Sequence, residues 1–578
     1  MSLDISVIPF SSHGSFMAVS HINSKFGGAE IKPGLYFRSV HGIANIPGRS
    51  DNIPAVLRIV PLYKGSPVEY TTEFNPWELK LVFDQGTISL TFANIDTLLF
   101  KGNGVDVGLK LELWEKLSGY VHPVQYGDTN YQLLNCLSAG TRLVTLNQQG
   151  SLAVQSDWPE TQGSPSFTFG VDENGEFLAV IEEVANDWLS KTFDYDYEKC
   201  SRKQKSEYLS FADKYPHTPK EYEAGRSVAC YVNWSSVVRK TGLLTRDAMY
   251  MSKNWMNGVW SWDHCFNAMA LSYHNSELAW DQFMIMFDHQ DETGMLPDCI
   301  TDVCKVTAFV KPPIHGWALS KMLKHMTLNI DQKYQAYDRL VRWTNWWLNN
   351  RDRDGDGLCE YYHGNDSGWD NSTAFDRSPT MALPDLSAFL VIQMDVLSDL
   401  ARELGRTADS DFWKTRSDSM LESMIKHQFE NGYPKAIISG SHERVPNESL
   451  LLYCPIILGE RLPEPFRSNI LAVLQSDRFY TTHGFATEPP QSGKYNSDGY
   501  WRGPIWAPSS MLIIEGIRKC GDIDLATDAA RRFCNMVQEN GPAENFDALT
   551  GVGLRDRAFT WTASVFLILA HEYLSKMK

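Results

Sequence analysis

The sequence contains no run of about 18 apolar residues, so it predicts no membrane-spanning helix. Its first lysine is Lys25, and an N-terminal stretch without an early positive charge is not typical of a secretory signal. The 10 cysteines are scattered and include no C-x-x-C pair, which excludes a zinc-finger pattern and a disulfide framework. We therefore expect a cytoplasmic protein with reduced thiols.

Basic clusters and several catalytic motifs are also missing. The chain has 53 Lys and Arg against 70 Asp and Glu, a formal charge of −17, and no basic run long enough to form a patch. Such a surface repels the phosphates of nucleic acids. The P-loop, the dinucleotide-binding glycine motif, the G-x-S-x-G elbow and the H-E-x-x-H motif are absent. We expect a small-molecule partner, and neither nucleic acid nor a membrane.

Aromatic residues are abundant by contrast. The sequence has 18 Trp, 24 Tyr and 28 Phe. An indole is costly to bury completely because its N–H needs a hydrogen-bond partner. A chain so rich in tryptophan has many large helix–helix contacts or a pocket lined with flat rings, and core packing is the simpler interpretation for any single ring.

The first third of the chain shows the pattern of an antiparallel sheet. Apolar runs joined by short glycine-ended turns predict hairpins. Such runs pair residues 79–83 with 87–92, 142–146 with 152–154, and 167–171 with 177–181. Residues 1–186 are therefore expected to form a β-rich, sandwich-like domain, and the charged stretch 187–218 is expected to be a connector with some helix.

The remainder, residues 219–578, has helical periodicity. Apolar residues recur at helical spacing, as in Leu340, Trp343 and Trp347. About twelve helices are predicted, at 219–235, 262–273, 276–289, 312–326, 331–349, 382–404, 407–428, 447–457, 462–474, 503–519, 522–540 and 557–576. Six sequential pairs fit an (α/α)6 barrel, although another large helical domain would fit as well.

Four long segments between the predicted helices are rich in Trp, Gly and acidic residues. They are 254–264, 352–376, 487–506 and 540–557. Long loops in a compact domain are usually functional. Paired carboxylates among flat rings suit glycoside hydrolysis, in which one carboxylic acid protonates the leaving oxygen and the other group activates water or attacks carbon. Indole faces also pack well on the C–H faces of a pyranose.

Five short motifs resemble glycoside hydrolase family 63. They are GWDNS at 368–372, YWRGPIW at 500–506, ENF at 544–546, WD at 262–263 and PPIHGW at 312–317. The resemblance spans about 220–578 and implies an (α/α)6 barrel after a β-rich domain. It implies an inverting, exo-acting hydrolase of a terminal α-linked sugar, most often an α-glucoside. The family's general acid falls on Asp370 and its general base on Glu544, while Thr373 stands where the family commonly has proline.

The same resemblance implies a sugar-binding set around the two carboxylates. Its members are Trp262, Asp263, Lys311, His315, Trp317, Gly368, Trp369, Asn371, Tyr500, Trp501, Arg502 and Trp506. Each has a structural alternative, since indoles pack in cores, Asp263 suits a helix N-cap and Arg502 suits an ion pair. Of Trp501 and Trp506, we expect one to face sugar and the other to pack.

A further acidic motif resembles a calcium loop. Asp352, Asp354 and Asp356 alternate before Gly357, and Glu360 follows. Alternating oxygen ligands before a sharp turn suit a hard cation, but Glu360 comes too soon for an EF-hand. A turn held by side-chain hydrogen bonds explains the pattern equally well. Calcium would be structural, and no cofactor is expected for catalysis.

Other functions stay open at this point. A phosphorylase would use phosphate instead of water and would not need Glu544. An α-mannoside hydrolase of the mannosylglycerate type and a non-catalytic carbohydrate-binding protein are further alternatives. The sequence does not identify the aglycone, the choice between glucose and mannose, or the oligomeric state.

Overall fold

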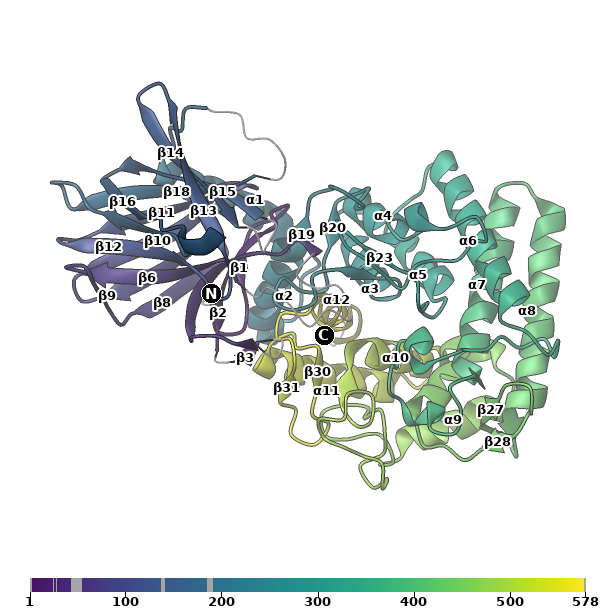
Figure 1. Ribbon diagram of the computed structural model, residues 1–578. Helices are drawn as coiled ribbons and strands as arrows, with labels where there is room; N and C mark the ends of the chain where they lie inside the picture. The colour runs from purple at the N-terminus through teal and green to yellow at the C-terminus, as the bar shows by residue number, and fades with distance from the viewer. Residues whose placement is uncertain are drawn as a thin grey trace.

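The computed structural model describes residues 3–23, 25–26, 29–42, 55–136, 141–184 and 191–575. Antiparallel sheets occupy the part before residue 185, and helices dominate the part after residue 190 (Figure 1). This mixed α and β organisation agrees with the expected fold class at that level. The expected boundary between residues 186 and 187 lies outside the described residues.

Two eight-stranded sheets pack face to face in the N-terminal part. The first contains β1 (Phe10–Ser11), β2 (Met17–Ile22), β5 (Gly34–Ser39), β6 (Leu57–Tyr63), β7 (Ser66–Pro67), β12 (Val107–Leu113), β16 (Ser151–Gln155) and β17 (Ser166–Gly170). The second contains β8 (Thr71–Asn75), β9 (Glu78–Phe83), β10 (Gly86–Asn94), β11 (Thr97–Asn103), β13 (Gly119–Tyr126), β14 (Thr129–Cys136), β15 (Thr141–Gln149) and β18 (Glu176–Val184). Alternate apolar residues of both sheets fill one core.

One of the three expected hairpins is confirmed and two are wrong. β9 and β10 pair with Val82 opposite Thr87. By contrast, β15 pairs with β14 and β18, while β16 pairs with β17 in the other sheet. β17 and β18 also lie in different sheets, where Phe169 and Phe177 face each other with ring centroids 6.4 Å apart. β15, β17 and β18 bury apolar residues, and Leu152 of the mostly exposed β16 packs against the shared core, so the chain crosses from sheet to sheet at these turns.

The connector is more helical than expected. α1 (Tyr197–Ala212) begins at Asp196, whose carboxylate accepts a hydrogen bond from the Lys199 backbone N–H at 2.9 Å. This helix packs against β10. It therefore covers the sheet face that the sandwich core leaves open, which explains why β10 is buried along most of its length.

Each predicted helix of the C-terminal part has a counterpart. The α-helices are α2 (Glu223–Ser236), α3 (Asp263–Leu271), α4 (Ser276–Met284), α5 (His315–Met322), α6 (Ile330–Asn350), α7 (Pro384–Glu403), α8 (Thr407–Gln428), α9 (Phe466–Gln475), α10 (Ala507–Lys519), α11 (Ile523–Asn540) and α12 (Thr560–Leu569). The segment predicted at 447–457 is η7 (Leu450–Arg461), a 3-10 helix that contains Pro455, a residue without an N–H to donate. α12 continues as the π-helix η8 (Ala570–Leu574).

Alternate helices of this part pack against one another in turn. α3 contacts α5, α5 contacts α7, and α7 contacts η7. η7 contacts α10, α10 contacts α12, and α12 returns to α3. The segments that precede these helices therefore approach one another at one end. Among the described helices, none is long and apolar enough to cross a membrane.

Short sheets hold the loops at this end. They are formed by β19 (Val237–Val238) with β20 (Ala248–Met249); β21 (Val259–Trp260), β22 (Cys299–Ile300) and β23 (Lys305–Val306); β24 (Met381–Ala382), β27 (Ala436–Ile438) and β28 (Arg444–Val445); β25 (Phe429–Glu430) with β26 (Tyr433–Pro434); and β29 (Ile505–Trp506), β30 (Asn545–Phe546) and β31 (Gly553–Leu554). The pair β29–β30 sets Trp506 opposite Asn545. It thereby joins two of the sequence motifs, which lie about 40 residues apart.

Candidate active site

A cavity of about 260 Å³ opens among the loops before α3, α5, α7, α10 and α12. We call it the carboxylate cavity. It is lined by Met256, Trp260, Trp262, Asp263, Asp298, Val306, Phe309, Lys311, Asn365, Gly368, Asp370, Tyr500, Trp501, Glu544, Phe559 and Trp561. Both carboxylates assigned from the sequence are in this set, together with six of the expected sugar-binding residues.

The backbone turn before Asp370 depends on Gly368. This glycine has φ +73°, and a Cβ on it would lie 2.6 Å from the Trp262 ring. Any other side chain would displace the indole that lines the cavity, so glycine permits the close approach. The turn leaves the Asp370 side chain about one third exposed, with Oδ1 lacking a hydrogen-bond partner among the described residues. The exposed part of this carboxyl faces the cavity and is available to a substrate.

The cation nearest to Asp370 is Lys311. Its Nζ lies 3.7 Å from Asp370 Oδ1 and 3.0 Å from Asp298 Oδ1, and it donates to the Asn365 carbonyl at 2.7 Å. Asp263, fully buried, also interacts with this ammonium. Three carboxylates thus share one positive charge.

This shortage of positive charge affects the protonation of the cluster. Burial raises the pKa of Asp370 above its usual value, Lys311 opposes that rise, and the Asp298 charge adds to it. Burial also raises the pKa of Asp263, far above that of an exposed aspartate. The surroundings therefore favour a protonated carboxylic acid at the edge of the cavity, as general acid catalysis requires.

Glu544 enters the cavity from the other side, on the loop after α11. Its backbone N–H donates to the Asp556 carbonyl at 2.7 Å, and its own carbonyl accepts from Trp561 Nε1 at 3.3 Å. Burial, and next the charge of Asp556, raise the pKa of Glu544 to about 8, while Arg555 opposes the rise. The Asp370 charge adds to it, so the two carboxyls interact across the cavity.

Stacked indoles form one wall. Trp501 lines the cavity and lies on Trp506, with ring centroids 3.9 Å apart and planes within 6°. Trp369 covers Trp501 from another side at 4.7 Å, and Trp262 lies 6.2 Å away. Trp506 Nε1 donates to the Tyr500 carbonyl at 2.9 Å, which satisfies its buried N–H. The wall offers a rigid, flat apolar face of the kind that packs on a sugar ring.

Six of the twelve expected sugar-binding residues lie outside this cavity. They are His315, Trp317, Trp369, Asn371, Arg502 and Trp506. Trp369 and Trp506 support Trp501, as described above. His315 is fully buried at the start of α5 against His264 and Phe287, and Trp317 Nε1 points at Glu515. We therefore assign these four side chains to packing around the site.

Asn371 and Arg502 fix one loop to another. The Asn371 side chain donates to the Gly499 carbonyl at 3.0 Å and accepts from the Trp501 N–H at 2.9 Å. Arg502 donates to the Asn371 carbonyl and pairs with Asp376, both at 2.7 Å. These bonds hold the indole wall against the loop that carries Asp370.

Sequence reasoning missed several lining residues. They are Met256, Trp260, Asp298, Val306, Phe309, Asn365, Phe559 and Trp561. Met256, Trp260 and Asn365 lie inside loops that the sequence marks as functional, and their composition could have indicated them. Asp298, in contrast, follows a short loop without any motif, and only the β21–β22 pairing brings it to the cavity.

A second depression of about 320 Å³, the side cavity, shares Asp370 with the carboxylate cavity. Its other lining residues include His363, Phe375, Arg377 and Arg502. Arg377 is exposed and makes no hydrogen bond or ion pair with the described residues. Asp370 therefore lies between two spaces, one closed by indoles and one bordered by basic side chains.

The acidic loop after α6 brings three of its four expected ligands together. Asp352, Asp354 and Asp356 place one carboxylate oxygen each within 4.8 Å of one another. Their oxygens also accept bonds from the backbone N–H groups of Gly357, Leu358 and Gly440. Burial, followed by the nearby Asp354 and Asp352 charges, raises the pKa of Glu360. Repelling carboxylates in one turn are a donor set that fits a hard cation.

Comparison with known proteins places this site in a family. The family described as mannosylglycerate hydrolase MGH1-like glycoside hydrolase domain matches residues 256–562, more than half of the chain. The chain belongs to this glycoside hydrolase family. The matched residues include both Asp370 and Glu544.

Individual relatives are distant. A mannosylglycerate hydrolase of Rubrobacter radiotolerans is 23% identical over 53% of this chain and 89% of its own length. A glucosylglycerate hydrolase of Mycolicibacterium hassiacum is 21% identical over 54% of this chain and 91% of its own length. Together with the family match, these relatives show that the chain is a glycosidase of the family 63 type.

Solved structures resemble the fold of this hydrolase. A family 63 mannosylglycerate hydrolase of Thermus thermophilus, solved with glucose, aligns with a TM-score of 0.52 at 20% identity. It covers 59% of this chain and 98% of its own. A bacterial glucoamylase solved with acarbose aligns with a TM-score of 0.61 at 12% identity, over 98% of this chain and 93% of its own. The second likeness extends through the N-terminal sheets.

Proposed function

We propose that this glycosidase removes a terminal α-linked sugar by inverting acid/base catalysis, with Asp370 as the general acid and Glu544 as the general base. The observation that carries the proposal is that these two carboxyls, 174 positions apart in the sequence numbering, line one cavity with raised pKa values. An indole wall lies beside them. An acid to protonate the leaving oxygen and a base to activate water are the groups this chemistry needs.

The two cavities suggest how a substrate lies. The terminal sugar would occupy the carboxylate cavity, with Asp263 and Lys311 binding its hydroxyls and Trp501 under its ring. The aglycone would extend into the side cavity, so that the glycosidic oxygen meets Asp370 between them. Glu544 would then hold a water at the anomeric carbon. A sugar space walled by indoles beside a more open aglycone space supports exo action.

The helical part is proposed to be an (α/α)6 barrel in which α3, α5, α7, η7, α10 and α12 form the inner ring. The circular series of contacts that leads from α12 back to α3 supports this arrangement. Residues 219–578 would then be the catalytic domain, 1–186 the sandwich and 187–218 the connector. The proposed cytoplasmic location stays a prediction from the sequence.

An α-glucoside is the proposed substrate class, and an α-mannoside is the alternative. The relatives named above act, by their names, on mannosylglycerate or glucosylglycerate. The free guanidinium of Arg377 in the side cavity favours an aglycone that carries a carboxylate, as a glycerate does. The deciding experiment is incubation with glucosylglycerate, mannosylglycerate and neutral α-disaccharides, with the released sugar measured. A marked preference for the neutral disaccharides would contradict the role of Arg377.

The first prediction concerns the catalytic pair. Asp370→Asn and Glu544→Gln should each lower kcat on an unactivated glycoside by about 10²–10⁴-fold, the usual contribution of a general acid or base. A substrate with a good leaving group needs little protonation, so it should restore turnover in Asp370→Asn but not in Glu544→Gln. Asp399→Asn, an exposed acid on α7 paired with Arg402 and away from both cavities, is the control. Near wild-type hydrolysis by Asp370→Asn on the unactivated substrate would refute the assignment.

The second prediction concerns stereochemistry. Water attack from the face opposite the leaving group should release the β-anomer from an α-glycoside, before mutarotation mixes the anomers. Proton NMR of the anomeric signals in the first minutes measures this directly. Initial release of the α-anomer would instead mean a covalent intermediate with Glu544 as the nucleophile. Product formation that requires phosphate would favour the phosphorylase alternative.

A structural calcium ion is proposed for Asp352, Asp354 and Asp356, with Glu360 beside them. The closeness of the three carboxylates supports this proposal. Bound calcium would neutralise their repulsion and fix the loop that leads to Asp370. It would take no part in the reaction.

A further inference from the structure

A third cavity lies at the opposite ends of the helices that support the carboxylate cavity. We call it the basal cavity. It has a volume of about 400 Å³ and is lined by Tyr273, Lys321, Lys324, His325, Glu515, Arg518, Lys519, His571, Glu572 and Tyr573. Tyr273 follows α3, Lys321 is in the last turn of α5, and Arg518 is in the last turn of α10. The cavity is therefore separate from the proposed catalytic site.

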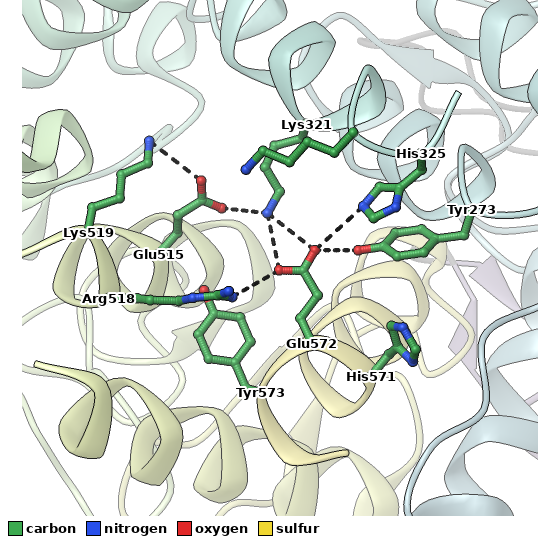
Figure 2. Close-up of a pocket in the computed structure, with 10 residues that line it drawn as sticks. Tyr273, Lys321, His325, Glu515, Arg518, Lys519, His571, Glu572 and Tyr573 are labelled. Carbon is green, nitrogen blue, oxygen red and sulfur yellow. Dashed lines mark hydrogen bonds and ion pairs between the residues drawn. The ribbon is translucent and has the colours of Figure 1, made fainter. Parts of the chain in front are cut away.

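Two carboxylates at this cavity are each shared among several cations (Figure 2). Glu515 lies 2.9 Å from Lys321 Nζ and 3.5 Å from Lys519 Nζ. Glu572 lies 3.4 Å from Lys321 Nζ and 3.2 Å from Arg518 Nη1. Lys321 is almost fully buried and uses both carboxylates. The acids thus neutralise two of the charges that line the space.

The basic groups outnumber these acids. Lys324 lines the same space and makes no ion pair with the described residues, so four permanent cations face two carboxylates. His325 stacks on Tyr273 with ring centroids 3.7 Å apart, and His571 lies nearby. In a chain of net charge −17, this local excess of positive charge is unusual.

The helix ends account for part of this arrangement. Cations near a helix C-terminus are favoured by the helix dipole, which suits Lys321, Arg518 and Lys519. Lys324 lies beyond the end of α5, and the positive charge of Lys321 acts on it. Burial, and then that charge, lower the pKa of Lys324. Glu515 and Glu572 oppose this lowering, but neither forms an ion pair with the Lys324 ammonium.

We propose that the basal cavity binds a small phosphate-bearing anion, held by Lys324, Lys519 and Arg518. A phosphate group accepts hydrogen bonds on several oxygens and compensates two positive charges at once. The cavity has room for more than the phosphate, since about 400 Å³ falls within the usual range for small-molecule sites. The Tyr273 and Tyr573 rings could contact the organic part of such a molecule.

The ligand class covers two sources, free phosphate and a phosphorylated sugar. Isothermal titration calorimetry of the full chain with inorganic phosphate and with glucose 6-phosphate, at constant ionic strength, tests both. We expect one saturable site. Lys324→Gln and Lys519→Gln should each raise the Kd by about tenfold or more, in the range that losing a charged hydrogen bond produces. Stronger binding of glucose 6-phosphate would identify the sugar phosphate as the better ligand.

Two controls separate this site from general charge effects. Lys203→Gln removes the same charge from an exposed position on α1, and Asp370→Asn alters the carboxylate cavity. Both should leave the Kd unchanged. The proposal is overturned if neither anion shows saturable binding up to about 10 mM, a concentration above which affinity is negligible. Equal weakening by Lys203→Gln, or loss of binding in Asp370→Asn, would also overturn it.

Discussion

Lys311 is the residue on which the electrostatics of the carboxylate cavity depend. It is the only ammonium among the lining residues, and Asp263, Asp298 and Asp370 all interact with it. Burial alone would lower the pKa of a lysine, but the three carboxylates, Asp370 first among them, raise that of Lys311. Lys311 therefore stays charged. Because its one positive charge is shared among three carboxylates, Asp370 can still hold a proton.

A third prediction follows for the pH dependence. The active form needs one proton on the pair, on Asp370, while Glu544 is ionised. The proton belongs to the pair as a whole, and the pair loses it near the pKa of about 8 to which Glu544 is raised. The upper limb of the kcat/KM profile should therefore lie near pH 8. Initial rates across pH 5–10 at low substrate concentration measure this limb.

A variant gives the sign of the effect. The charge of Asp556 is the largest contribution, after burial, to the raised pKa of Glu544. Asp556→Asn removes that charge and keeps one acceptor oxygen, which serves either the Ala558 or the Trp255 N–H group, because these bond different oxygens of Asp556. The pKa of Glu544 should fall, and the upper limb should move to lower pH. An unchanged limb in Asp556→Asn would show that another group determines it.

At the residue scale, motif residues that the sequence places at loop ends lie together in the structure. Asp370, Glu544 and Trp501 are such cases, and all line one cavity. His315, whose motif also marks the start of a helix, is instead fully buried outside that cavity. A motif records that a residue is constrained, but contact with substrate and support of a neighbour impose similar constraints. Burial, which distinguishes the two, depends on partners far along the chain.

At the scale of elements, helices were easier to predict than strand partners. The 3.6-residue period of α6 is local, and its Asn329–Gln332 capping box marks the start. The turns at Gly150 and at 172–175 are local signals too, but they say only that the chain reverses. Whether the next strand joins the same sheet depends on which distant strands complete the core, and β16 and β18 both joined the opposite sheet.

The fourth prediction concerns the acidic loop after α6. If calcium binds Asp352, Asp354 and Asp356, it stabilises the folded state by about 2.7 kcal/mol at one hundred times its Kd. The Tm should therefore rise when calcium is added to chelator-treated protein. Asp354→Asn should abolish the rise, because it removes the charge of one of the three carboxylates. Asp354 also accepts a hydrogen bond from the Gly440 N–H, which ties the loop to that residue.

The matched control is Asp399→Asn, an exposed acid paired with Arg402 on α7. It should keep the full calcium response. A Tm that is identical with calcium and with chelator would show instead that backbone N–H groups and the His442 imidazole, which lies 3.5 Å from Asp354 and 3.4 Å from Asp356, hold the turn. Magnesium should give a smaller rise, because it tolerates irregular coordination less well.

At the scale of the whole molecule, the N-terminal sheets hold a loop of the active site. Arg38 of β5 donates to the backbone carbonyls of Lys253 and Asn254, and its guanidinium lies over the Trp255 ring. Met256, the next residue, lines the carboxylate cavity. The sandwich, which has no catalytic motif of its own, thus positions one wall of the site.

Lys253 makes the reverse connection, from the helical part into the sandwich. Its fully buried Nζ donates to Ser11 Oγ, to the carbonyls of Ser12 and Ser15, and to that of Val237, at 2.6–3.2 Å. No carboxylate pairs with it among the described residues, and burial lowers its pKa well below the usual value. An ammonium has three N–H donors, so these four buried acceptors share them, and the carbonyls of Ser12 and Val237 also accept from the Ser15 and Gly14 backbone N–H groups.

The fifth prediction is that Lys253→Met both destabilises the protein and lowers its activity. The Ser15 carbonyl and Ser11 Oγ lose the amine as a donor, and each buried acceptor left without a donor costs about 1–3 kcal/mol, so the urea midpoint should fall. Because Lys253 precedes the loop that carries Met256, kcat/KM should fall as well, while the upper limb of the pH profile should stay in place. Lys240→Met, an exposed lysine near the same junction, should change neither. A Lys253→Met enzyme with wild-type stability and kcat/KM would show that the sandwich is only attached to the catalytic part. Lower stability with unchanged kcat/KM would confine its role to folding, since the loop would then keep its position without the amine.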